Sequence, residues 1–70
     1  MKHFTAIDKN GNQIGIDDDV IVPDPNDTDI HAHSFTGMVI EIKENGNVIV
    51  QDSEWDCFEI EGNRLELDNE

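Results

Sequence analysis

Asp27, Asp29, His31 and His33 occupy every second position of one segment, and their residue types resemble a site for chemistry more than any others in this chain. In an extended strand, residues two apart project from the same face, so both imidazoles can approach one cation. Nearby carboxylates supply charge and orient the rings, as they do around zinc. Two histidines with Asp29 and an open position predict a site for Zn²⁺ or Ni²⁺. The alternative is a solvated polar loop, because loops need not alternate and two histidines do not complete a four-ligand set.

The segment of residues 8–12 begins like a calcium-binding EF-hand loop, with oxygen-bearing side chains at its first, third and fifth positions. Gln13 stands where that loop requires glycine, and Asp19 stands where it requires a bidentate glutamate. The Asn-Gly pair inside the segment is typical of a tight hairpin turn. We therefore interpret it as a turn between two strands.

Cys57 is the only thiol in the sequence, and a nucleophilic role would need a histidine as its base. It lies among Asp56, Glu59 and Glu61, whose negative charge disfavours the reactive thiolate. The other carboxylates are scattered, and a chain of 70 residues offers little volume for a deep pocket that would desolvate a pair of them. We expect a protein that is not an enzyme.

Trp55 follows a short acidic run, and two interpretations of it stay open. A tryptophan on a polar surface is a common anchor for a protein partner, but it can equally cover one end of a small fold. A partner site would use Trp55 and Phe35 as apolar contacts. Asp24, Asp27 and Asp29 would supply negative charge that attracts a basic peptide.

The charge of the chain is strongly unbalanced. Seventeen Asp and Glu residues face four Lys and Arg residues, so the formal net charge is −13. Such a field repels phosphate backbones and anionic membrane surfaces, so we expect neither direct nucleic-acid binding nor membrane binding. A non-enzymatic acidic binding module that docks a basic protein or peptide is the function we expect first.

Two alternatives remain. Six acidic residues and no basic residue lie between Asp17 and Asp29. This run favours an acidic nucleic-acid mimic that blocks a nucleic-acid-binding protein. The other alternative is a metal-binding accessory protein that uses His31 and His33.

The single cysteine excludes an internal disulfide and suits a reducing compartment. The first ten residues lack the apolar core of a signal peptide, and no apolar run is long enough to cross a bilayer. We therefore expect a cytoplasmic protein. It would be a monomer, or a weak homodimer paired through the exposed edge of its first hairpin.

Short β-branched runs separated by turn signals dominate the chain, and no apolar spacing of helical type persists over three turns. Asn-Gly occurs at residues 10–11 and again at 45–46, and each pair predicts a turn between two antiparallel strands. Pro23 and Pro25 end the third strand because neither ring can donate to a ladder. The expected strands cover residues 3–7, 13–16, 20–22, 35–43, 48–52, 55–61 and 65–67.

Alternation predicts which side chains face the core. Along residues 35–43 it places Met38, Ile40 and Ile42 on the inner side. The other predicted core residues alternate with polar neighbours in their own strands in the same way. They are Val20, Val22, Val48, Val50, Phe58, Ile60, Leu65 and Leu67.

The order of these elements resembles an SH3-like small β-barrel, with KOW and Tudor-like domains as the nearest versions. The matching segments are DVIVPDP, TGMVIEI, NGNVIVQD, DCFEIEG and NRLEL. They fall within residues 18–68, with residues 1–16 as an N-terminal hairpin extension, in a single domain of residues 1–70. The resemblance implies an all-β fold in which about five antiparallel strands form a small barrel. The basic loops of KOW domains have no counterpart in this sequence.

Overall fold

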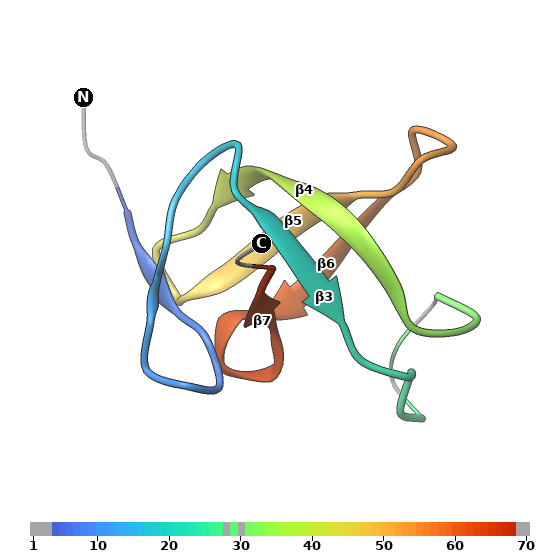
Figure 1. Cartoon of the computed structure of the whole chain (residues 1–70), viewed down its shortest axis with the longest axis horizontal. Coiled ribbons are helices and arrows are strands. Elements are labelled where there is room, and N and C mark those ends of the chain that lie inside the picture. The colour runs from blue at the N-terminus through green and yellow to red at the C-terminus, as the bar shows by residue number, and fades with distance from the viewer. Residues whose placement is uncertain (1–3, 28, 30, 69–70) are drawn as a thin grey trace.

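The computed structural model describes residues 4–27, 29 and 31–68 of the chain (Figure 1). Its regular elements in these ranges are strands and one short 3-10 helix, so the all-β prediction is confirmed. No helix within these ranges is long and apolar enough to cross a membrane. The elements are β1 (Ala6–Ile7), β2 (Gln13–Ile14), β3 (Asp19–Val22), β4 (Phe35–Ile42), β5 (Asn47–Gln51), β6 (Cys57–Glu61), η1 (Gly62–Arg64) and β7 (Glu66–Leu67).

Five strands form one sheet in the order β6-β5-β4-β3-β7, and every pairing in it is antiparallel. β1 and β2 form a separate two-stranded hairpin. β6 and β7 are the two edges of the sheet, and η1 joins them along the chain. In the described residues these two edges do not pair with each other, so the sheet is open.

The two Asn-Gly pairs lie in tight turns, as predicted. Gly11 and Gly46 have φ angles of 86° and 89°, a conformation that glycine adopts without the steric cost of a Cβ atom. The first turn joins β1 to β2, and the second joins β4 to β5. The first hairpin is shorter than predicted, and its expected first residue, His3, lies outside the described residues.

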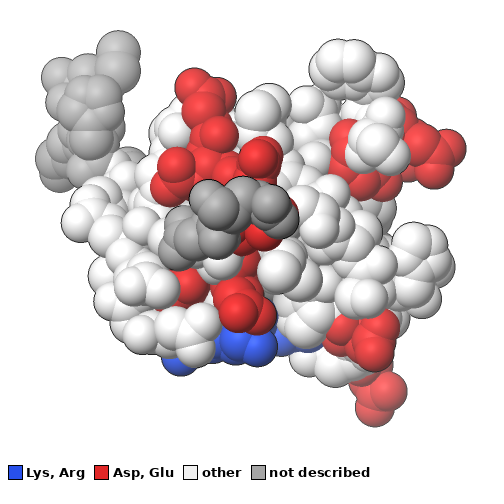
Figure 2. All heavy atoms as spheres, in the orientation of Figure 1, with Lys and Arg blue, Asp and Glu red and all other residues white. Residues whose placement is uncertain are grey.

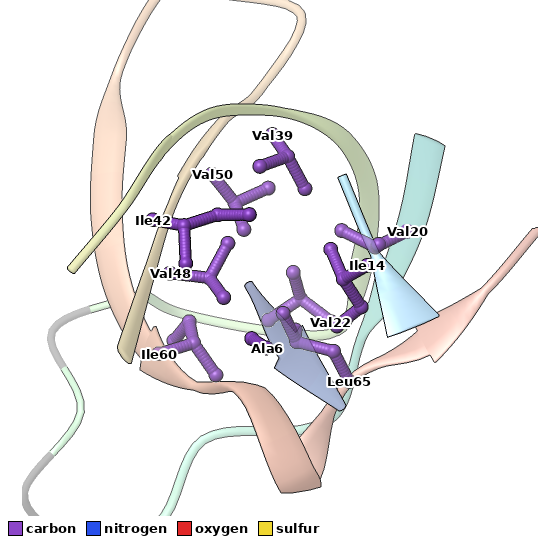
Figure 3. Close-up of a cluster of buried hydrophobic side chains, with 10 residues drawn as sticks. All are labelled: Ala6, Ile14, Val20, Val22, Val39, Ile42, Val48, Val50, Ile60 and Leu65. Atoms are coloured by element: carbon purple, nitrogen blue, oxygen red, sulfur yellow. The ribbon is translucent and has the colours of Figure 1, made fainter. Parts of the chain in front are cut away.

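Ten apolar side chains converge on one core, which β4 wraps around (Figure 3). The four valines predicted for β3 and β5 are fully buried, which confirms the faces of those strands. Ala6 and Ile14 are buried in the same cluster, so the N-terminal hairpin packs into the core of the sheet. Phe58 and Leu67 are partly buried against this cluster. Its members are Ala6, Ile14, Val20, Val22, Val39, Ile42, Val48, Val50, Ile60 and Leu65.

The predicted inner face of β4 is wrong over its central residues. Met38 and Ile40 are each 38% exposed, whereas Val39 is fully buried. The register with β5 shifts between Val39 and Glu41, which leaves Ile40 as an extra residue on β4. A β-bulge changes which residues of a strand face inward, because each single-residue slip moves side chains to the opposite face. Ile42, beyond the bulge, is buried as predicted.

Asp8 connects the hairpin to the edge of the sheet. Its buried carboxylate accepts a hydrogen bond of 3.0 Å from the backbone N–H of Leu67 in β7. It also accepts bonds of 2.9 and 2.7 Å from the N–H groups of Asn10 and Asn12 in its own turn. The bond from Leu67 is the main reason that the pKa of the Asp8 carboxyl is lowered.

Candidate functional site

The segment of residues 23–34, between β3 and β4, carries the Asp and His pattern. In Figure 1 it lies at the same end of the molecule as the turn between β5 and β6. Asp24 closes the segment on itself, because its carboxylate accepts a hydrogen bond of 3.1 Å from the backbone N–H of Ser34. Side chains from the middle of the segment fix it to the body of the protein.

Asp29 is held by Arg64. The Nη1 and Nη2 atoms of the guanidinium donate hydrogen bonds of 3.0 and 2.7 Å to the two carboxylate oxygens. These bonds are the main reason that the pKa of Asp29 is lowered to about 2. A bidentate pair of this kind fixes orientation as well as charge, so Asp29 serves to anchor the segment.

His31 is 5% exposed and packs edge-on against two phenylalanine rings. Its ring centroid lies 5.7 Å from that of Phe35 and 5.9 Å from that of Phe58. Its Nε2 atom lies 2.8 Å from the backbone oxygen of Pro23. A carbonyl only accepts, so Nε2 donates this hydrogen bond. Nδ1 is buried and has no hydrogen-bond partner in the described part of the chain.

The structure does not bring the predicted metal ligands together. His31 is buried against aromatic rings, whereas His33 is exposed and its Nδ1 lies 2.9 Å from the backbone oxygen of Ser34. Asp29 is paired with Arg64. Within residues 4–27, 29 and 31–68, no three His, Cys, Asp or Glu side chains are placed to hold one metal ion.

An open pocket of about 300 Å³ lies between this segment and the turn that joins β5 to β6. Phe35, Phe58 and His31 line it with aromatic rings. The rings of the two phenylalanines are 5.5 Å apart and inclined at 56°. Three carboxylate residues of the turn also line the pocket, so it combines aromatic and acidic side chains; they are Asp52, Glu54 and Asp56.

Gly37 makes room for the ring of Phe35. A Cβ atom at Gly37 would lie 3.0 Å from the Cε2 atom of Phe35, and 2.5 Å from the Cγ1 atom of Val50. Both distances are closer than side chains normally pack. The absent side chain therefore lets the Phe35 ring lie along the inner side of β4, beside Phe58.

Trp55 lies on the turn of residues 52–56, which has the same hydrogen bonds as the two Asn-Gly turns. Its N–H donates to the oxygen of Asp52 at 3.2 Å, and the N–H of Asp52 donates to the oxygen of Asp56 at 2.9 Å. The equivalent bonds close residues 8–12 at 3.1 and 2.8 Å and residues 43–47 at 3.0 and 2.8 Å. Trp55 therefore occupies the position of the two turn glycines, with φ of 70°. It is 79% exposed, so it does not cover an end of the fold.

The few positive charges of the described residues are already paired. Lys9 binds Glu66 at 3.3 Å, Lys43 binds Glu59 at 3.1 Å, and Arg64 binds Asp29. On the face in view in Figure 2, carboxylates cover several regions and the basic side chains are confined to the lower rim. The acidic residues that line the pocket form no ion pair in the described part of the chain.

Among the side chains predicted to bind a partner, Phe35 lines the pocket and Trp55 lies on the turn beside it. Asp24 and Asp27 are exposed within the segment of residues 23–34, and Asp29 is paired with Arg64. Phe58 and the carboxylates of residues 52–56 were not predicted to line a pocket. The sequence signal that could have indicated the carboxylates is the acidic run before Trp55.

These features define a small all-β domain with an open five-stranded antiparallel sheet, an attached hairpin, and one aromatic and acidic pocket. No protein-family model matches the chain, and searches of curated proteins and of solved structures give no match either.

Proposed function

We propose that the chain is a non-enzymatic acidic binding module that docks a basic protein or peptide at the pocket between residues 31–36 and the turn of residues 52–56. The observation that carries the proposal is the combination of aromatic rings and carboxylates in one pocket, beside an exposed Trp55. Within the described residues these carboxylates form no ion pair.

A lysine or arginine side chain matches both parts of this pocket. Its aliphatic stem can pack on Phe35 and Phe58, while its charged end meets the carboxylates of the turn. A cation over an aromatic face adds about 0.5–1 kcal/mol at an exposed site. The net charge of −13 attracts such a partner over a longer range and raises its rate of encounter.

The proposal includes the finer description of the fold as an SH3-like barrel. The curvature of β4 around the core supports it (Figure 3), as does the attachment of the hairpin to β7 through Asp8. In a small barrel, loops at one end of the strands gather into a single surface. Here that surface would combine residues 23–34 with the turn of residues 52–56.

Three charge-matched double variants test the proposal with a fluorescently labelled peptide rich in Lys and Arg. Each variant removes the same charge: E54Q/D56N at the pocket, E41Q/E44Q as a control, and D17N/D19N elsewhere. Glu41 lies near the end of β4, and Glu44 lies in the turn between β4 and β5. This turn is at the opposite end of β5 from the pocket. We expect E54Q/D56N alone to weaken peptide binding strongly. Equal losses in all three variants would contradict a localised site.

A nucleic-acid mimic is the second candidate, and the exposed carboxylates of Asp17 and Asp19 favour it. Asp19 is the first residue of β3 and Asp17 lies two residues before it, and neither lines the pocket. A mimic would bind a basic nucleic-acid-binding protein through them, with steep salt dependence. If the chain is a mimic, D17N/D19N would lose binding to the basic partner and E54Q/D56N would not.

A further inference from the structure

The turns of residues 8–12, 43–47 and 52–56 have the same backbone hydrogen bonds. The fourth residue of each turn has a positive φ angle, so these residues can be compared directly. Two of the turns place glycine there, and the third places Trp55. Left-handed backbone is unfavourable for any residue with a Cβ atom, and more so for a bulky side chain. Strain of this kind is retained at functional sites when the side chain is needed there.

Among the described residues, the indole of Trp55 makes no hydrogen bond and no ring pair that would offset this strain. The side chain of Trp55 is 79% exposed, and its ring takes part in none of the aromatic pairs, which join His31, Phe35 and Phe58. The turn is held instead by Asp52, whose Oδ1 atom accepts hydrogen bonds of 2.9 and 3.0 Å from the N–H groups of Glu54 and Asp56. The fold therefore holds the turn in shape while the indole points into solvent.

We infer that Trp55 is an anchor that this chain inserts into an apolar cavity of a partner protein, and that basic side chains surround that cavity. The inference rests on the proposed function and names the chemistry of the partner. Tryptophan buries a large apolar area at a small cost in side-chain entropy, and buried Trp residues dominate the energies of many interfaces. The neighbouring Glu54 and Asp56 would meet the basic rim as the indole enters.

A second copy of this chain does not fit as the partner. Its pocket is lined by carboxylates, and each copy carries a net charge of −13, so two copies repel one another. An unrelated protein with a basic rim has the complementary charge.

The first part of the test is stability. W55G and W55N place at this position the residues that tolerate left-handed backbone, so each should raise the folding equilibrium constant, W55G by about 5- to 30-fold. E54G is the matched control, because it introduces the same flexible residue one position earlier, and it should not stabilise the chain. If W55G is no more stable than wild type, the inference is wrong.

The second part is burial of the indole. Trp55 is the only tryptophan of the chain, so 5-fluorotryptophan labelling gives a single ¹⁹F resonance. Proteins retained on the immobilised wild-type chain from a cell lysate are purified and added to the labelled chain one at a time. A partner of the inferred kind shifts this resonance, shields it from a soluble paramagnetic agent, and binds W55G at least about 30-fold more weakly.

The outcomes separate the inference from the proposed function. If purified partners leave the resonance accessible, or bind W55G as tightly as wild type, the anchor is rejected. If the basic peptide still binds in that case and E54Q/D56N abolishes its binding, the proposed function stands alone. If the peptide does not bind wild type and no protein is retained on it, both are rejected.

Discussion

Arg64 holds Asp29 across 35 residues of sequence through two hydrogen bonds of 3.0 and 2.7 Å. This pair fixes the middle of the segment of residues 23–34 to the η1 turn, next to the edge of the sheet. The aromatic side of the pocket depends on the same segment, because His31 follows Asp29 by two residues and packs on both phenylalanine rings. The ion pair therefore positions the site without lining the pocket itself.

The Asp29 carboxyl should make stability depend on pH in the acid range. Its pKa is lowered from 3.8 to about 2, so the folded state favours the ionised form. The stabilisation is complete above about pH 4 and is lost as the pH falls toward 2. Urea unfolding at several pH values should show a smaller loss of stability for D29N than for wild type between pH 4 and pH 2. The exposed D27N is the control, and equal losses for wild type and D29N would contradict the assignment.

The bulge in β4 predicts losses of different size for two neighbouring substitutions. V39A removes methyl groups from the core and should lower the free energy of unfolding by about 2 kcal/mol. I40A shortens a partly exposed side chain and should lower the free energy of unfolding by less than about 1 kcal/mol. Chemical denaturation measures both. A larger loss for I40A would mean that the strand has the regular alternation seen in its sequence.

Gly37 should not tolerate a side chain. In G37A the new Cβ atom would lie 2.5 Å from a methyl group of Val50 and 2.7 Å from the backbone oxygen of Gln51. We therefore expect the free energy of unfolding to fall by about 1–3 kcal/mol. The NMR resonances of the Phe35 ring should also shift in G37A. G15A is the control, since the nearest atom to its Cβ would be 3.4 Å away, on the side chain of Asp18. Equal stabilities of G37A and G15A would contradict the close approach.

Metal titration should distinguish the two histidines of residues 31 and 33. His33 is exposed and should respond to Zn²⁺ or Ni²⁺ only at millimolar concentrations, as an isolated surface imidazole does. His31 should keep its resonances, because Nε2 is bonded to Pro23 and the ring is buried. Coordinated shifts of both rings at micromolar metal would instead support the site predicted from their spacing.

The positions of the strands follow from local features of the sequence. Asn-Gly pairs marked two turns, and alternating valines marked β3 and β5, because turn chemistry and side-chain period act over a few residues. The bulge did not follow, because Met38, Ile40 and Ile42 alternate regularly and only the pairing with β5 reveals the extra residue.

The sequence predicts the site only from its residue types. Phe35 and Trp55 were predicted as apolar contacts because both are large aromatic residues, and Trp55 also has acidic neighbours. The pairing of Arg64 with Asp29 depends on tertiary structure and has no local signal. The left-handed turn at Trp55 was missed because glycine or asparagine normally marks that position.

The most direct test of the central claim is a map of backbone amide shifts in the ¹⁵N-labelled chain as the Lys- and Arg-rich peptide is added. A docked basic partner should perturb one contiguous surface, made of residues 31–36 and 52–58, and should leave the turn of residues 43–47 unchanged. Shifts spread evenly over the exposed carboxylate residues, or centred on residues 17–19, would contradict the claim.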